Sequence, residues 1–143
     1  MLLRLHGIIR FFTVDIIHSK VDLINSKKSP IVDKEVEEYL ATKELDLITT
    51  IDGDRAYRDS ELVIIATPTN YDSITNKLDT SSVESVIEQV KRANSNVWTI
   101  VKSTVGVGFT KYVREKYEYD NILFSLGFIR EGKALYDIHI LQE

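Results

Sequence analysis

Apolar runs alternate with polar stretches along the whole chain. Four runs are strongly apolar, at residues 8–17, 61–68, 96–104 and 121–125, and a weaker run occupies 45–51. The strong runs are rich in Ile, Val and aromatic residues, which favours strands over helices. Their apolar character is continuous rather than alternating, and this is typical of strands covered on both faces in a parallel sheet. The runs therefore predict a parallel sheet.

Helical periodicity lies between these runs, at residues 20–26, 33–41, 81–94 and 110–117. The clearest pattern is a Val/Ile stripe within 81–94, where Ser81 and Glu84 predict a capping box. Asp33 is the expected N-cap of the helix at 33–41. Strands that alternate with helices predict an α/β fold, a doubly wound parallel sheet.

The helix at 110–117 is shorter. Its pattern predicts that Tyr112, Val113 and Tyr117 face inward.

Ligands of open parallel sheets bind beyond the carboxyl ends of the strands. Asp15 follows the first run, where its carboxylate either accepts hydrogen bonds from ribose hydroxyls or caps the helix that begins near Ser19. Thr67 and Thr69 flank Pro68 after the next strong run, because proline stops the strand there. This loop is either an ordinary turn or part of a ligand-binding site.

Two later loops also follow the carboxyl ends of predicted strands. "KSTVGVGFT" places Ser103 and Thr104 at a strand end, followed by Gly106 and Gly108, which permit close backbone approach. The G-x-G spacing resembles part of a dinucleotide-binding fingerprint, but that fingerprint follows the first strand of the fold, not a later one. The last strong run is followed by a charged stretch at 130–133, which by itself indicates a solvated loop.

Composition narrows the function classes. The chain has 143 residues, which fits one domain, and the net charge of -4 does not favour nucleic acid or an anionic membrane as a partner. It has no cysteine, and its three histidines are scattered, so no metal site is expected. No stretch reaches the roughly 18 apolar residues of a membrane span, and no cleavage site follows the N-terminal run. We expect a cytoplasmic protein.

Several stretches together resemble the N-terminal, NAD-binding domain of the bacterial UDP-glucose 6-dehydrogenases. They are "KVDLINSKKSPIVDKEVEEYLA", "ELVIIATPTNYD", "KSTVGVGFT" and "FSLGFIREGKALYD". The last is close to the family signature S-P-E-F-L-R-E-[GS]-K-A-L-Y-D. The resemblance covers residues 14–137, and it identifies 1–143 as a partial NAD-binding domain with an aberrant segment at 1–13.

The resemblance implies the chemistry of the site. The family oxidises UDP-glucose to UDP-glucuronate, a polysaccharide precursor, with two NAD molecules and a thioester on a cysteine. By resemblance, Asp15 binds the adenosine ribose with Lys20 beside it, and Thr69 and Thr104 contact NAD. Thr104 also positions catalytic water. Glu131 lies near the nicotinamide, and the segment Phe128, Ile129, Arg130 and Glu131 cradles the sugar nucleotide.

The sequence departs from the family pattern in three places. The G-x-G-Y-V-G turn and its strand are absent, because a compact βαβ unit needs about 30 residues and only 14 precede Asp15. Leu126, Gly127 and Gly106 replace a proline, a glutamate and a proline of the family. The catalytic cysteine and the UDP-binding domain are also missing from these residues.

These departures predict weak NAD binding and an incomplete Rossmann-like sheet. Losing two hydrogen bonds to the pyrophosphate costs about 3–6 kcal/mol, or roughly 10² to 10⁴ in affinity. The first expectation is therefore a fragment of a UDP-glucose dehydrogenase that is inactive alone. The alternatives are a non-enzymatic remnant that binds nucleotide weakly or pairs with a full-length enzyme, and a fragment of a related sugar-nucleotide dehydrogenase. A homo-oligomer is also possible.

Overall fold

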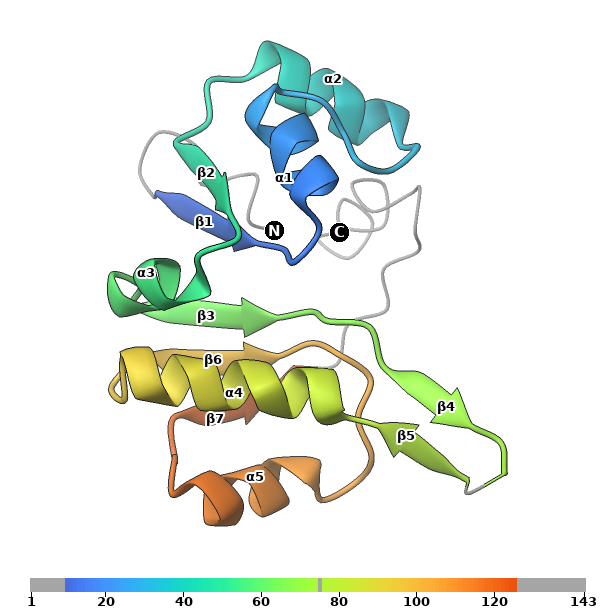
Figure 1. The fold of residues 1–143 in the computed structure, drawn as a ribbon, viewed down its shortest axis with the longest axis vertical. Helices are drawn as coiled ribbons and strands as arrows, with labels where there is room; N and C mark the ends of the chain where they lie inside the picture. The colour runs from blue at the N-terminus through green and yellow to red at the C-terminus, as the bar shows by residue number, and fades with distance from the viewer. Residues whose placement is uncertain (1–9, 75, 126–143) are drawn as a thin grey trace, which may run out of the picture. The chain divides into compact units, whose positions relative to one another are not determined.

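The computed structural model describes residues 10–74 and 76–125 of the chain, and Figure 1 shows their helices and strands. Described residues up to Asp52 belong to one compact unit, and those from Gly53 onward belong to a second. Each unit has its own parallel sheet.

The first unit is a strand–helix–helix–strand segment. Strand β1 (Phe11–Val14) pairs in parallel with β2 (Leu47–Thr50), with Phe11 opposite Leu47 and Val14 opposite Thr50. Helices α1 (His18–Asn25) and α2 (Lys34–Thr42) form the crossover between them. Two parallel neighbouring strands need a crossover connection of this kind. The two strands and two helices expected in this part of the chain are therefore confirmed.

Asp33 caps α2 as expected. Its Oδ1 accepts hydrogen bonds from the backbone N–H groups of Glu35 and Val36, at 3.1 and 3.2 Å. Two of the four free N–H groups at the helix start are thereby satisfied.

The second unit has a three-stranded parallel sheet in the order β3–β6–β7. The strands are β3 (Leu62–Ile65), β6 (Trp98–Val101) and β7 (Ile122–Phe124). Helices α4 (Ser81–Ala93) and α5 (Phe109–Tyr117) are the crossovers, as expected. The sequence did not predict helix α3 (Gly53–Arg58) or the antiparallel hairpin of β4 (Asn70–Asp72) and β5 (Lys77–Asp79).

The core of the second unit lies on one face of this sheet. Its fully buried side chains include those of Ile65, Val83, Ile87, Val90, Thr99, Val101, Val113 and Ile122. The stripe predicted on α4 therefore faces inward, because Val83, Ile87 and Val90 are all buried.

The other face of the same sheet is only partly covered. Leu62 and Trp98 are opposite one another in the register, and they are 50 % and 49 % exposed. Leu123 of β7 is 46 % exposed. The expectation that both faces are fully buried is wrong for this sheet.

Two helix details differ from the sequence prediction. The N-cap of α4 is Thr80 rather than Ser81, and Thr80 Oγ1 donates to Glu84 Oε1 at 2.9 Å. The expected capping box is wrong, because the Ser81 N–H is already bound by Asp79 Oδ1 at 3.0 Å.

Tyr112 of α5 is exposed, whereas inward packing was expected. Its hydroxyl donates to Glu84 Oε2 at 3.3 Å, so the ring contacts a partly buried carboxylate instead of packing in the core. Val113 is fully buried, as predicted, and Tyr117 is half-buried.

Each of the two parallel sheets, taken by itself, matches part of the Rossmann strand order 3-2-1-4-5-6. The pair β2–β1 corresponds to strands 3-2, and β3–β6–β7 corresponds to strands 4-5-6. No strand among the described residues corresponds to strand 1. The α/β class with parallel sheets is confirmed, and residues 1–9 of the segment expected to replace strand 1 lie outside the described residues.

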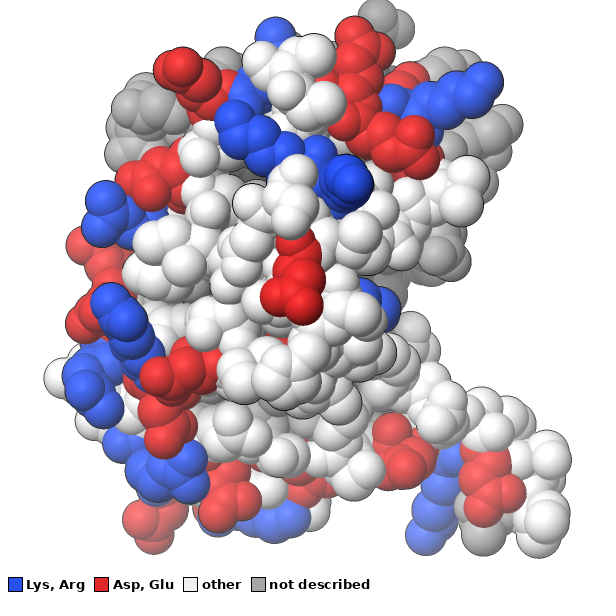
Figure 2. All heavy atoms as spheres, turned by 45° about the horizontal axis from the view of Figure 1, so that its top comes forward, with Lys and Arg blue, Asp and Glu red and all other residues white. Residues whose placement is uncertain are grey.

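Lysine and arginine side chains alternate with aspartate and glutamate on the face shown in Figure 2. This mixture agrees with the totals of 18 basic and 22 acidic residues. In the part of the chain that the structure describes, no helix combines the length and apolar character needed to cross a membrane.

Candidate functional site

Asp15 directly follows β1 in the first unit. Its backbone N–H donates to the carbonyl oxygen of Thr50 at 3.3 Å, so the strand pairing extends to this residue. Its Oδ1 accepts from the N–H of Ile17 at 2.9 Å, a local turn that aspartate favours. Helix α1 begins with Ile17 as its N-cap and has no side-chain cap, so Asp15 is not the N-cap. The local turn leaves Oδ2 for another partner.

Lys20 lies in the first turns of α1, and its Nζ is 4.0 Å from Asp15 Oδ2. The two side chains are 44 % and 30 % exposed, so water screens the pair and its contribution to stability is small. The structure therefore brings together the two residues of the first unit that the resemblance singles out, at the carboxyl end of a parallel strand.

The loop after β3 is held by two serines from elsewhere in the second unit. Ser103 Oγ donates to the carbonyl oxygen of Thr67 at 2.7 Å, and Ser103 is buried. Ser82 Oγ donates to the carbonyl oxygen of Pro68 at 2.8 Å and lies 3.2 Å from Thr67 Oγ1. The loop that contains Thr69 is therefore tied to both α4 and the end of β6.

Thr104 follows the buried Ser103 and is exposed. Farther along this loop, Gly108 is the N-cap of α5 and has a φ of +86°, a conformation that favours glycine. A Cβ at Gly106 would meet no atom within 4 Å, so this position has room for a side chain. Thr104 is thus an exposed residue in a loop that ends in a left-handed glycine.

The remaining expected site residues are Phe128, Ile129, Arg130 and Glu131. They lie outside the described residues, as do Leu126 and Gly127. Their roles stay predictions.

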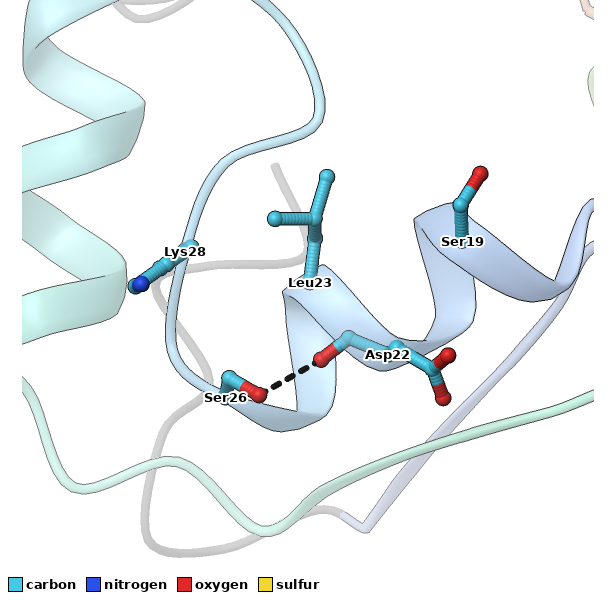
Figure 3. A pocket seen from close by; sticks show the side chains of 5 residues that line it. All are labelled: Ser19, Asp22, Leu23, Ser26 and Lys28. Atoms are coloured by element: carbon cyan, nitrogen blue, oxygen red, sulfur yellow. Dashed lines mark hydrogen bonds between the residues drawn. The ribbon is translucent and has the colours of Figure 1, made fainter.

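A shallow hollow of about 380 Å³ lies on α1 and the turn that follows it (Figure 3). Its lining residues are Ser19, Asp22, Leu23, Ser26 and Lys28. Ser26 Oγ is already occupied, because it donates to the carbonyl oxygen of Asp22 at 2.7 Å. The hollow contains none of the expected site residues, and its lining carries one charge of each sign.

Glu84 and Lys116 join α4 to α5, a contact that no local sequence pattern predicts. Their Oε2 and Nζ atoms are 2.6 Å apart, and the ammonium lies 5.3 and 5.1 Å from the ring centroids of Tyr112 and Tyr117. Partial burial opposes ionisation of Glu84, but hydrogen bonds from Lys116 and Thr80 outweigh it and lower its pKa. The same hydrogen bond raises the pKa of Lys116.

The polar side chains at these strand ends suit part of a dinucleotide. A carboxylate at a strand end suits ribose hydroxyls, and the threonine hydroxyls at the ends of β3 and β6 suit further polar groups. The glycine-rich turn that would meet the pyrophosphate is absent from the sequence. Among the described residues, no cluster of three or more His, Asp or Glu side chains could hold a metal ion.

Solved structures define the class of fold. The chain superposes on a GDP-mannose dehydrogenase from Pseudomonas aeruginosa with a TM-score of 0.75 and 26 % identity, covering 89 % of this chain and 33 % of that one. A UDP-glucose dehydrogenase from Pyrobaculum islandicum gives a TM-score of 0.75 and 25 % identity, covering 90 % and 33 %. The fold is therefore that of the Rossmann dehydrogenases.

The sequence then defines the family. The model of the NAD binding domain of the UDP-glucose/GDP-mannose dehydrogenase family matches residues 5–142, and the chain belongs to this family. Over 124 residues it is 50 % identical to a UDP-glucose 6-dehydrogenase of Streptococcus pneumoniae and 43 % identical to one of Campylobacter jejuni. The match covers 87 % of this chain and 32 % of each relative, so the chain spans about a third of their length.

Proposed function

We propose that this chain is the NAD-binding part of a UDP-glucose 6-dehydrogenase, and that these 143 residues do not oxidise UDP-glucose by themselves. The observation that supports nucleotide binding most directly is Asp15. Its partly exposed carboxylate follows a parallel strand, Oδ1 accepts a hydrogen bond from the Ile17 N–H, and Oδ2 lies 4.0 Å from Lys20 Nζ. An acid in this position accepts hydrogen bonds from ribose hydroxyls in dinucleotide folds.

The other roles in the proposal follow the resemblance. Thr69 and Thr104 contact NAD, and Thr104 also positions water. Phe128, Ile129, Arg130 and Glu131 contact the sugar nucleotide, with Glu131 toward the nicotinamide. Two UDP-glucose 6-dehydrogenases are 50 % and 43 % identical to the chain, which supports UDP-glucose as the substrate class.

Titration of the chain with NAD tests the proposal. We expect binding in the millimolar range, and Asp15→Asn should weaken it about tenfold or more, because a hydrogen bond to a charged group is lost. Asp22→Asn is the matched control, since it removes the same charge from exposed α1. Equal affinity of the Asp15→Asn variant and wild type would contradict the ribose role, and no binding to wild type would contradict the NAD role.

Activity measurements test the second half of the proposal. The chain has no cysteine, so it has no thiol for a thioester. NAD and UDP-glucose together should therefore yield no UDP-glucuronate with the purified chain, because the second oxidation, to the carboxylate, passes through the thioester. Production of UDP-glucuronate at a rate proportional to the chain's concentration would refute this part.

A second candidate function is association with a full-length dehydrogenase. Among the described residues, β1 pairs only with β2 and β3 pairs only with β6, so each strand has an edge without a described neighbour. Such edges can pair with another chain. Co-purification with a full-length UDP-glucose dehydrogenase tests this candidate, and a homo-oligomer is tested by sedimentation. A cytoplasmic location and a role in polysaccharide precursor synthesis are further proposals, which cell fractionation and gene deletion test.

A further inference from the structure

Three segments that are distant in sequence meet at the loop after β3. Ser82, from the first turn of α4, donates to the carbonyl oxygen of Pro68, and Ser103, after β6, donates to that of Thr67. The two consecutive carbonyl groups before Thr69 are thus both held by serine hydroxyls. The Ser103 N–H and the Lys102 N–H also donate to the carbonyl oxygen of Ile65, at 3.3 and 2.8 Å, which fixes the start of the loop.

The bond to Pro68 sets the direction of the next amide. The Pro68 carbonyl and the Thr69 N–H belong to one planar peptide group, and in a trans peptide they point in opposite directions. The described residues contain no cis peptide bond. Because the Pro68 carbonyl points at Ser82, the Thr69 N–H points away from α4.

Ser82 is not needed to start α4. Asp79 Oδ1 accepts from the Ser81 N–H, and Thr80 Oγ1 donates to Glu84 Oε1, so the side-chain contacts at this end of the helix are made by residues other than Ser82. The Ser82 hydroxyl makes its hydrogen bonds with the 67–68 segment instead. Its contacts therefore serve the loop rather than the helix.

We propose that Ser82 is a positioning residue for the nucleotide site: its hydroxyl fixes the Pro68–Thr69 peptide so that Thr69 meets the dinucleotide in one orientation. This inference rests on the proposed function, since it requires that Thr69 contacts NAD. Ser103 anchors the preceding carbonyl, so loss of Ser82 would free the Pro68–Thr69 peptide while leaving the base of the loop in place. A reduced NAD affinity without global destabilisation is the expected signature.

The test compares Ser82→Ala with Ser82→Thr and Ser85→Ala in the full chain, with NAD as the probe. Ser82→Thr keeps a hydroxyl. Ser85 lies on the exposed side of the same helix, where its hydroxyl accepts from Gln89 Nε2 at 3.2 Å. Three readouts are needed: the NAD dissociation constant, the melting temperature, and hydrogen exchange of the Thr69 amide.

Ser82→Ala should weaken NAD binding about three- to tenfold and alter exchange at Thr69, while Ser82→Thr and Ser85→Ala stay within about twofold of wild type. Unchanged affinity in Ser82→Ala would overturn the positioning role and leave the proposed function intact. An equal loss in Ser85→Ala, with an equal fall in melting temperature, would also overturn it, because the effect would then be general destabilisation. If wild type binds no NAD, the proposed function fails and this inference fails with it.

Discussion

The side-chain amide of Asn25 makes both hydrogen bonds that a neighbouring strand would offer to Thr49. Its Nδ2 donates to the Thr49 carbonyl oxygen at 2.9 Å, and its Oδ1 accepts from the Thr49 N–H at 3.1 Å. Thr49 is in the middle of β2, which has no strand on this side among the described residues. The last residue of α1 therefore protects the outer edge of the sheet, where unpaired backbone groups invite aggregation.

Asn25→Ala should expose this edge. We expect the unfolding free energy to fall by about 1–2 kcal/mol, since two hydrogen bonds are lost and water replaces them in part. Faster hydrogen exchange at the Thr49 amide would measure the local effect. Asn25→Asp is the informative control, because a carboxylate accepts from the N–H but cannot donate to the carbonyl. If the alanine variant exchanges at the wild-type rate, the edge-protection role is wrong.

Asp33→Ala should remove the cap of α2. Two backbone N–H groups lose their acceptor, which costs about 1 kcal/mol of stability, within a range of 0.5–2. Urea unfolding measures the change. Asp33→Ser keeps a capping oxygen and should recover much of the loss, whereas equal destabilisation by both variants would show that the buried carboxylate matters for another reason.

Gly53→Ala should destabilise the second unit. An added Cβ would lie 2.8 Å from Cε2 and 3.1 Å from Cζ of Tyr57, and this ring is buried. Overpacking of this kind costs about 1–3 kcal/mol. Gly106→Ala is the control, because a Cβ there has open space and alanine reduces the entropy of the unfolded chain. Chemical denaturation should separate the two variants, and similar midpoints would contradict the expected clash.

Glu84→Gln should lower the melting temperature by about 2–5 °C near pH 7, because it weakens the link from α4 to Lys116. The folded state lowers the pKa of Glu84, so the ionised carboxylate stabilises the fold above its ordinary pKa. This stabilisation is lost as the pH falls below about 4.3, the ordinary value, and through the lowered one.

The melting temperatures of wild type and Glu84→Gln should therefore converge in acid. Glu88→Gln, at an exposed position of the same helix, is the control and should differ little from wild type at any pH. A constant difference between wild type and Glu84→Gln across the whole acid range would show that the effect does not come from the carboxylate charge.

The sequence predicted the elements whose apolar residues are buried. The core strands and the α4 stripe were found because Ile65, Val83 and Val101 follow clear patterns and are fully buried. The β4–β5 hairpin was missed because its strands have three residues each and are mostly exposed. Helix α3 was missed because it has six residues and begins with a glycine.

The candidate site could be predicted only where position along the chain determines it. The rule that ligands lie beyond strand ends selected Asp15 and Ser103 as candidates, and their roles stay predictions. The hydrogen bonds of Ser82 and Ser103 join residues 14 and 36 positions apart, and no local pattern marks them. The same limit explains why Glu84 was read as half of a capping box, whereas its main partner lies on another helix.

The half-covered face of the β3–β6–β7 sheet gives the protein an intrinsic optical reporter. Trp98 is the chain's one tryptophan, and it stands at the first position of β6 on that face, with about half of its surface open to solvent. Any macromolecule or segment that settles there would remove water from the indole ring and shift its emission maximum to shorter wavelength. Occupancy of this sheet face could therefore be followed by fluorescence in the unlabelled protein.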